Sequence, residues 1–282
     1  MKMKNIKIFL TLVVALSIVS CSDFLDKAPT TSQSTEVTLS NFAGLDKAAY
    51  GAMMPMYSWY STSYILTNEM RSGNGRREND GQFQSGRYAT EYIWNYSADN
   101  TSGMWGNAYY VISAANNVIN NLEGKDQEAG VTMQDLNNLK AECLFTRALA
   151  HHILVLYYAQ PFTYQPDGPG VSVVLVSDLS TPARNTTREV YAQIVADLTE
   201  AEQIIDPNYV RSGVIDAKAT VTLPAIQALL SRVYLYMGEW QKAADYATKV
   251  INNGKYSLWT AEELPTVWTK DVADNGGEII ME

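Results

Sequence analysis

Apolar residues recur at intervals of three and four positions over most of the chain between residues 39 and 254. This spacing places them on one face of an α-helix, so it is typical of amphipathic helices that pack around a shared core. We therefore predict helices over residues 39–57, 104–122, 133–158 and 186–205, followed by two shorter helices within 222–254.

Local signals predict where several of these helices begin and end. Thr186 and Glu189 stand three residues apart at the start of a periodic segment, which is the arrangement of a capping box. Gly124 is expected to end the second helix, since glycine favours the backbone conformation that follows a helix. Pro161 is expected to end the third helix, because proline cannot continue one.

Two stretches lack helical spacing. Residues 58–103 are rich in Ser, Asn, Gly, Arg and aromatic residues, and we predict that they form long irregular loops. Residues 160–185 contain several proline and glycine residues around the apolar run from Val171 to Val176. That run predicts either a small strand or an extended connector.

The segment 222–254 resembles one tetratricopeptide repeat, a hairpin of two helices. It has large, small, aromatic and turn residues at the repeat's positions: Leu230, Ser231, Tyr234, Gly238, Trp240, Ala243 and Ala247. One repeat cannot bury its own faces and must stack on neighbouring helices. The predicted fold is therefore all-α, a tetratricopeptide-like α/α superhelix with long irregular loops.

The first 20 residues have the pattern of a secretory signal peptide. Three lysines precede an apolar run of about a dozen residues, which is shorter than the roughly 20 needed to span a bilayer. A small residue followed by Cys21 then suits bacterial lipoprotein processing, so we predict lipid on Cys21. An ordinary secretory signal with a coincidental cysteine is the alternative. Residues 21–36, polar and aperiodic, are predicted to be a lipidated tether, and residues 37–282 the helical domain.

Composition excludes some partners. The chain has a formal net charge of −9, and removal of the signal lysines makes it more acidic. Nucleic acid is therefore an unsuitable ligand, and neutral ligands fit best. With Cys21 acylated, Cys143 has no partner for an intramolecular disulfide, so stability must come from the core.

No short motif for catalysis, phosphate binding or metal binding occurs in the sequence. His151 and His152, the only histidines, are adjacent on a predicted helix and point about 100° apart, so they cannot share a metal on one face. We interpret them as core or interface residues. No enzymatic activity and no cofactor is predicted.

Taken together, several segments resemble the SusD/RagB family of outer-membrane nutrient-binding lipoproteins of Bacteroidetes. The similar stretches are Cys21 to Pro29, Trp105 to Asn117, Lys140 to Pro161, Thr181 to Ala201 and Gly277 to Ile280. The tetratricopeptide-like pair of helices at 222–254 also stands where members of this family have such a pair. Two departures are His151-His152 in place of aromatic residues and Ala159-Gln160 before Pro161. Family members are longer, so the resemblance implies a further carboxy-terminal region beyond Glu282.

The resemblance implies a lipid-anchored protein on the outer face of the outer membrane. It also implies glycan as ligand and a SusC-type TonB-dependent transporter as partner in nutrient uptake. Two alternatives stay open: a helical-repeat lipoprotein scaffold that binds peptide or another nutrient, and a surface-anchored glycoside hydrolase.

Glycan binding requires flat aromatic faces beside groups that bond to sugar hydroxyls. Two predicted loops offer such residues, and in the family part of the ligand contacts come from loops in this region. The candidate ligand-binding residues are Trp59, Tyr60, Tyr64, Arg71, Trp94 and Tyr96. The alternative for each aromatic residue is a place in a small core beneath the loop.

Other aromatic residues and two arginines are assigned to structure. We predict core or interhelix packing for the helical aromatic residues Trp105, Tyr109, Tyr157, Tyr234 and Trp240. Arg147 and Arg184 are predicted to form structural ion pairs, because they are cations within an acidic protein.

Overall fold

The computed structural model describes residues 34–59, 64–75, 88–95, 97, 103–213, 217–267 and 277–281. The chain divides into two compact units, residues 1–38 and 39–282. The predicted signal peptide, Cys21 and most of the predicted tether lie outside the described residues. Helix α2 (Thr35–Leu39) begins two residues before the expected start of the helical domain.

The second unit is built from helices, and no strand occurs among its described residues. The described residues also include the short 3₁₀ turns η2 (Met54–Met56), η5 (Lys125–Gln127) and η6 (Ala217–Ala219). The helices are α3 (Phe42–Met53), α4 (Tyr64–Ser72), α5 (Ala89–Ile93), α6 (Met104–Ile119), α7 (Met133–Tyr158), α8 (Thr187–Ile204), α9 (Leu223–Met237), α10 (Trp240–Asn252) and α11 (Leu264–Val267).

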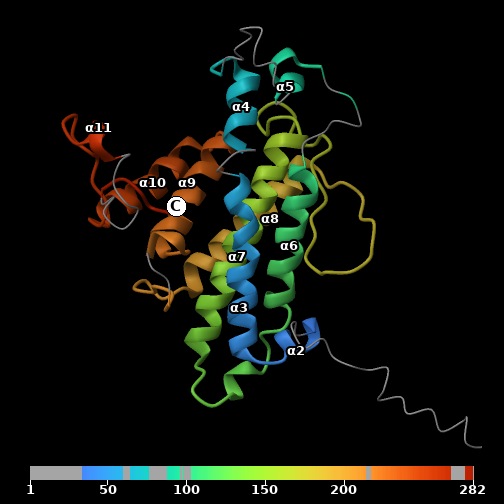
Figure 1. The fold of residues 1–282 in the computed structure, drawn as a ribbon, viewed down its shortest axis with the longest axis vertical. Helices are drawn as coiled ribbons and strands as arrows, with labels where there is room; N and C mark the ends of the chain where they lie inside the picture. The colour runs from blue at the N-terminus through green and yellow to red at the C-terminus, as the bar shows by residue number, and fades with distance from the viewer. Residues whose placement is uncertain are drawn as a thin grey trace, which may run out of the picture. The chain divides into compact units, whose positions relative to one another are not determined.

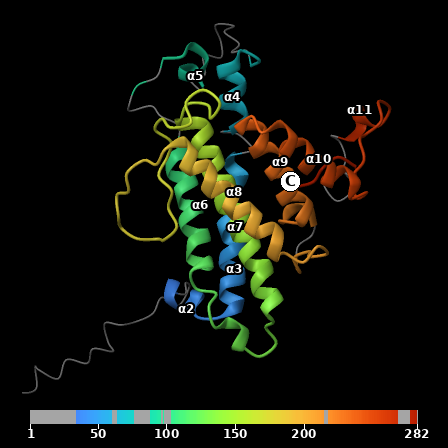
Figure 2. The same cartoon turned by 180° about the vertical axis from the view of Figure 1, so that it is seen from behind.

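Helix α7 is the centre of this unit. It packs against α3, α6, α8 and α9, as both ribbon views show (Figure 1 and Figure 2). Every residue from Ala141 to Val155 is buried, so this helix is enclosed on all sides. A helix in that position cannot show a polar stripe, and its interior polar residues must find partners inside the protein.

The longer helices confirm the all-α prediction. Helix α7 has the predicted bounds, and α8 begins with the predicted capping box of Thr186 and Glu189. The expected role of Gly124 was wrong, because α6 ends at Ile119 and Gly124 instead precedes η5 with a φ of 76°.

Between the helices, two other expectations are settled. Residues 58–103 were predicted to be loop, but α4 and α5 form there. These helices are only nine and five residues long, so their apolar pattern is too short to predict a helix. The run from Val171 to Val176 is an extended connector, with one isolated bridge between Pro169 and Thr186 nearby.

Helices α9 and α10 form the predicted tetratricopeptide-like hairpin. Gly238 ends α9 in the left-handed conformation, with a φ of 75°, and the hydroxyl of Ser231 donates to the carbonyl of Ala243 at 2.8 Å. Tyr234 is buried as expected, whereas Trp240 is 66% exposed, so its predicted packing role was wrong. In the described part of the chain, no helix is both long and apolar enough to cross a membrane.

Candidate functional site

The candidate ligand-binding residues fall in different environments. Tyr60 and Tyr96 lie outside the described residues, and Tyr64 is described only as the first residue of α4. Trp59 is 1% exposed within the main core, and its indole nitrogen has no hydrogen-bond partner. The ring of Trp59 therefore offers no open face to a sugar in this structure.

Trp94 has the opposite environment. It follows α5 and is 66% exposed. Both residues that flank this helix, Tyr88 and Trp94, have left-handed backbone conformations, with φ of 56° and 57°. That region is disfavoured for bulky residues by about 1–2 kcal/mol each, and such strain often accompanies functional sites. Trp94 is therefore held in a strained position with its ring largely in solvent.

A group of aromatic rings lies at the amino-terminal end of α6 and the carboxy-terminal end of α7. The Trp105 ring is centred 5.0 Å from those of Tyr109 and Tyr158, and the rings of Tyr157 and Tyr158 are 6.1 Å apart. Trp105 is 38% exposed and the three tyrosines are partly exposed. We call these four residues the aromatic platform.

Arg71 connects the platform to α4. Its guanidinium carbon lies 5.3 Å from the centre of the Tyr157 ring, within the range of a cation–π interaction. Helix α5, which Trp94 follows, packs against α4. Of the candidate residues from the sequence, Arg71 thus contacts the platform directly, whereas Trp94 follows a helix that packs against the helix of Arg71.

One face of α6 holds the extended segment 171–177, which we call the strap. Three α6 residues, and Asn120 directly after the helix, bond with the strap at intervals of four, three and four residues. The Tyr109 hydroxyl donates to Ser172 at 2.9 Å, and the Asn116 and Asn120 amides donate to Val174 and Leu175 at 3.0 and 3.1 Å. Ser113 bonds with Ser177. Side chains from one helix therefore pair with strap carbonyls that would otherwise lack partners.

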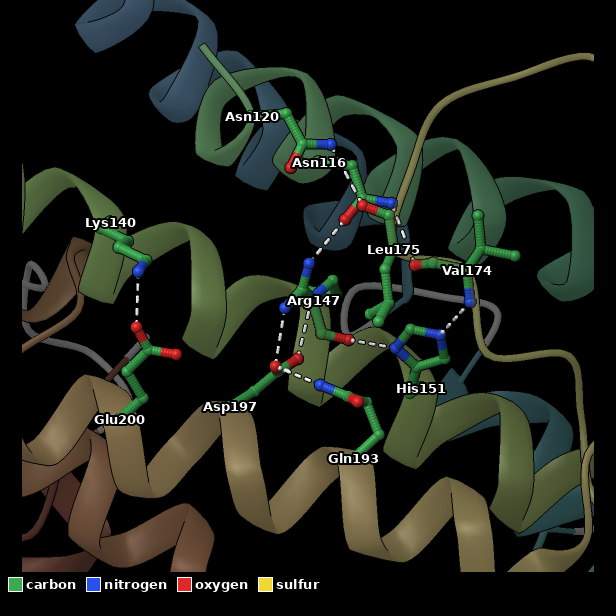
Figure 3. A network of polar contacts seen from close by, with 10 residues as sticks. All are labelled: Asn116, Asn120, Lys140, Arg147, His151, Val174, Leu175, Gln193, Asp197 and Glu200. Atoms are coloured by element: carbon green, nitrogen blue, oxygen red, sulfur yellow. Dashed lines mark hydrogen bonds and ion pairs between the residues drawn. The ribbon is translucent and has the colours of Figure 1, made fainter. Parts of the chain in front are cut away.

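A buried ion pair lies beneath this face (Figure 3). Arg147 donates from Nε and Nη2 to the two carboxylate oxygens of Asp197 at 2.8 and 2.7 Å, and from Nη1 to Asn116 Oδ1 at 2.8 Å. Gln193 adds a fourth bond, to Asp197 Oδ1. The predicted structural ion pair of Arg147 is confirmed, and its geometry is bidentate and enclosed.

Arg184 behaves differently from its prediction. Its guanidinium donates to the backbone carbonyls of Tyr158, Pro169 and Gly170, and no ion pair of Arg184 occurs among the described residues. The carbonyl of Tyr158 belongs to the last turn of α7, where carbonyls lack partners within the helix and a cation is favourable. Arg184 therefore caps α7 and ties it to the connector.

Both histidines are buried in the core, as predicted. His151 Nδ1 lies 3.0 Å from the carbonyl oxygen of Arg147, and the Val174 N–H donates to Nε2 at 3.4 Å. Burial and the positive charge of Arg147 lower the pKa of His151 to about 4. His152 lies edge-on to Tyr191 and Tyr236 with neither ring nitrogen hydrogen-bonded, and burial lowers its pKa to about 3.

The Tyr109 hydroxyl, which joins the platform to the strap, is uncharged. Burial raises the pKa of the Tyr109 hydroxyl, so it stays protonated and keeps its bond to Ser172. Within the described part of the chain, no group of three or more His, Cys, Asp or Glu residues is placed to hold a metal ion. The packing predicted for Trp105, Tyr109 and Tyr157 is confirmed by their ring contacts and by the contact of both tyrosines with the core, but helical spacing did not reveal that all three also stay partly exposed.

Comparison with known proteins identifies the family. A family profile described as starch-binding and associating with the outer membrane matches residues 23–235. The chain belongs to this SusD-like family. SusD-like protein P2 of Formosa agariphila is 30% identical over 260 residues, which cover 89% of this chain and 47% of that protein. A SusD-like protein of Bacteroides ovatus is 27% identical over 284 residues, which cover 98% of this chain and 45% of that protein.

Solved structures agree with the fold. A SusD superfamily protein from Bacteroides thetaiotaomicron is 31% identical with a TM-score of 0.69, covering 82% of this chain and 50% of that one. A protein from Bacteroides vulgatus, described as a putative sugar binding protein, is 32% identical with a TM-score of 0.60. The match covers 69% of this chain and 44% of that one. The chain thus spans about half the length of the relatives that it matches.

Proposed function

We propose that this SusD-like chain is part of a cell-surface lipoprotein that captures neutral glycan and passes it to a SusC-type TonB-dependent transporter for nutrient uptake. The observation that carries the proposal is the partly exposed aromatic platform, in a chain of a family described as starch-binding. Aromatic faces stack on the apolar faces of sugar rings. The net charge of −9 favours a neutral ligand over a polyanion.

The proposed binding surface extends from the platform through Arg71 to Trp94. Trp105 and Trp94 supply exposed ring faces, and the Arg71 guanidinium supplies hydrogen-bond donors for sugar hydroxyls. The strain at Trp94 supports a role in binding, since a glycine there would have no such cost. Tyr60, Tyr64 and Tyr96 stay candidates, and Trp59 would serve only by supporting the surface from the core.

Affinity electrophoresis in gels that contain soluble starch, xylan or galactomannan tests this proposal. We expect at least one polysaccharide to retard the wild-type chain, and Trp105→Ala and Trp94→Gly each to weaken retention by about tenfold, or 1.4 kcal/mol. Trp94→Gly should not destabilise the fold, because it relieves the left-handed strain as it removes the ring.

Trp240→Ala is the matched control, since Trp240 has the same 66% exposure as Trp94 but lies on α10. It should leave retention unchanged. Retention of the wild type by none of the polysaccharides, or an equal loss with Trp240→Ala, would contradict the proposal. Release of reducing sugar by the purified protein would favour the hydrolase alternative instead.

A further inference from the structure

The strap and the aromatic platform meet at Tyr109. The Tyr109 ring contacts Trp105, and its hydroxyl donates to the Ser172 carbonyl of the strap. Next to the strap, Arg184 donates to the backbone carbonyls of Tyr158 and Gly170. The position of the Tyr109 ring therefore depends on the path of the strap.

The centre of the strap is fixed by two buried side chains. Val174 donates its N–H to His151 Nε2 at 3.4 Å and accepts from Asn116 Nδ2 at 3.0 Å, as Figure 3 shows. His151 and Asn116 are fully buried and come from different helices, α7 and α6. Both backbone polar groups of one strap residue are thus paired with core side chains.

Neither side chain can exchange its roles. Arg147 can only donate, so it must bond to Asn116 Oδ1, and Nδ2 is left to donate to Val174. The Arg147 carbonyl can only accept, so His151 carries its proton on Nδ1 and leaves Nε2 as the acceptor. Arg147 is itself held by the bidentate bond to Asp197. The Arg147 guanidinium therefore specifies the orientation of the Asn116 amide, and the Arg147 carbonyl specifies which nitrogen of His151 carries the proton.

We propose that the strap is a positioning element of the aromatic platform, and that Asn116 and His151 are its positioning residues. They hold Val174, the strap holds the Tyr109 hydroxyl, and the Tyr109 ring is thereby kept against Trp105 in the spacing that a glycan contacts. The glycan part of this inference rests on the proposed function.

Asn116→Asp tests the inference with a change of one atom. The carboxylate still accepts from Arg147 but cannot donate to Val174, so the strap loses one of its two central bonds. In protein labelled with 5-fluorotryptophan, we expect the Trp105 resonance, assigned through Trp105→Phe, to shift while that of Trp240 stays. Retention by the polysaccharide that binds the wild type, tested first with soluble starch, should weaken about tenfold.

Two controls separate positioning from general stability. Asn121→Asp makes the same chemical change next to the end of α6, where the side chain donates to the Asn117 carbonyl and forms no hydrogen bond with the strap among the described residues. Leu198→Ala, in the core of α8, lowers stability without altering a strap bond. Both should leave the Trp105 resonance and the retention unchanged.

The inference is overturned if Asn116→Asp leaves the Trp105 resonance in place, or if Leu198→Ala shifts the resonance and weakens retention equally. Should Asn116→Asp fail to fold, Tyr109→Phe, which removes only the hydroxyl bond to Ser172, gives the same test. A wild-type chain that binds no polysaccharide would refute the proposed function alone, because the fluorine signal reports the ring position without ligand.

Discussion

Adjacent residues of one helix can have very different environments, and the two histidines illustrate this. His151 has a bond at each ring nitrogen, whereas His152 has none and contacts its surroundings through the edges of two tyrosine rings. Both are buried and stay neutral near pH 7, since their pKa values are lowered to about 4 and about 3. Each therefore resists protonation in the folded state more than in the unfolded chain.

The low pKa of His152 predicts a contribution to acid sensitivity. Below pH 6.5, the ordinary pKa of about 6.5 lets His152 bind a proton in the unfolded chain, whereas His152 in the folded protein stays neutral. The free energy of unfolding therefore falls as the pH drops from 6.5 towards 3. His152→Phe keeps a ring against Tyr191 and Tyr236 but cannot bind a proton, so it removes this source of pH dependence. Between pH 7 and pH 4 the variant should lose about 3 kcal/mol less unfolding free energy than wild type. Urea denaturation at several pH values measures this, and parallel curves would refute it.

At the scale of the helices, local sequence signals predict some elements, whereas others are identified only in the folded chain. Helices α7 and α8 both begin with a capping box, at Thr132 with Asp135 and at Thr186 with Glu189. Only the second was predicted, since the usual pattern has Glu or Gln at the third position. Helices α4 and α5, by contrast, are only nine and five residues long, so their apolar pattern is too short to predict a helix and they are identified only in the folded chain.

The cap of α8 makes a measurable contribution to stability. The Thr186 hydroxyl accepts from the N–H of Glu189 at 3.2 Å, and Thr186→Ala would leave that donor without its partner. We expect the free energy of unfolding to fall by about 1 kcal/mol. Thr248→Ala is the control, because that hydroxyl bonds only to a carbonyl of its own helix. Equal effects of the two changes in urea denaturation would argue against capping.

At the scale of the whole molecule, the chain combines an amino-terminal segment outside the described residues with a helical unit whose family is established. The family description concerns starch binding and the outer membrane. The lipid on Cys21 stays a prediction from the sequence, and such a lipid would hold the protein at a membrane surface.

Cys21→Ser tests the anchor. Each buried acyl CH₂ contributes about 0.8 kcal/mol to membrane binding, so loss of the acyl chains should move the protein from the membrane fraction to the soluble fraction. Fractionation of cells followed by immunoblotting measures the distribution. Cys143→Ser should remain in the membrane fraction, since this thiol is buried in the core. Retention of Cys21→Ser with the membranes would rule out the predicted anchor.

The sequence by itself determined the long helices, their order, the tetratricopeptide-like hairpin and the family resemblance. It could do so because helical periodicity and capping depend on residues within one or two turns of each other. It also predicted the burial of both histidines and the ion pair of Arg147, although it could not name Asp197 as the partner, 50 residues further along the chain.

Only the tertiary structure decided which aromatic residues are exposed. Trp59, predicted in a loop, is buried, whereas Trp240, predicted to pack, is 66% exposed. Trp105 packs against two tyrosines as predicted, yet it stays 38% exposed. Exposure depends on which helices cover a side chain, and that depends on contacts between segments far apart in sequence. The platform forms where α6 packs against α7, and the strap lies along α6. Both depend on contacts between residues far apart in sequence, so no local pattern could predict them.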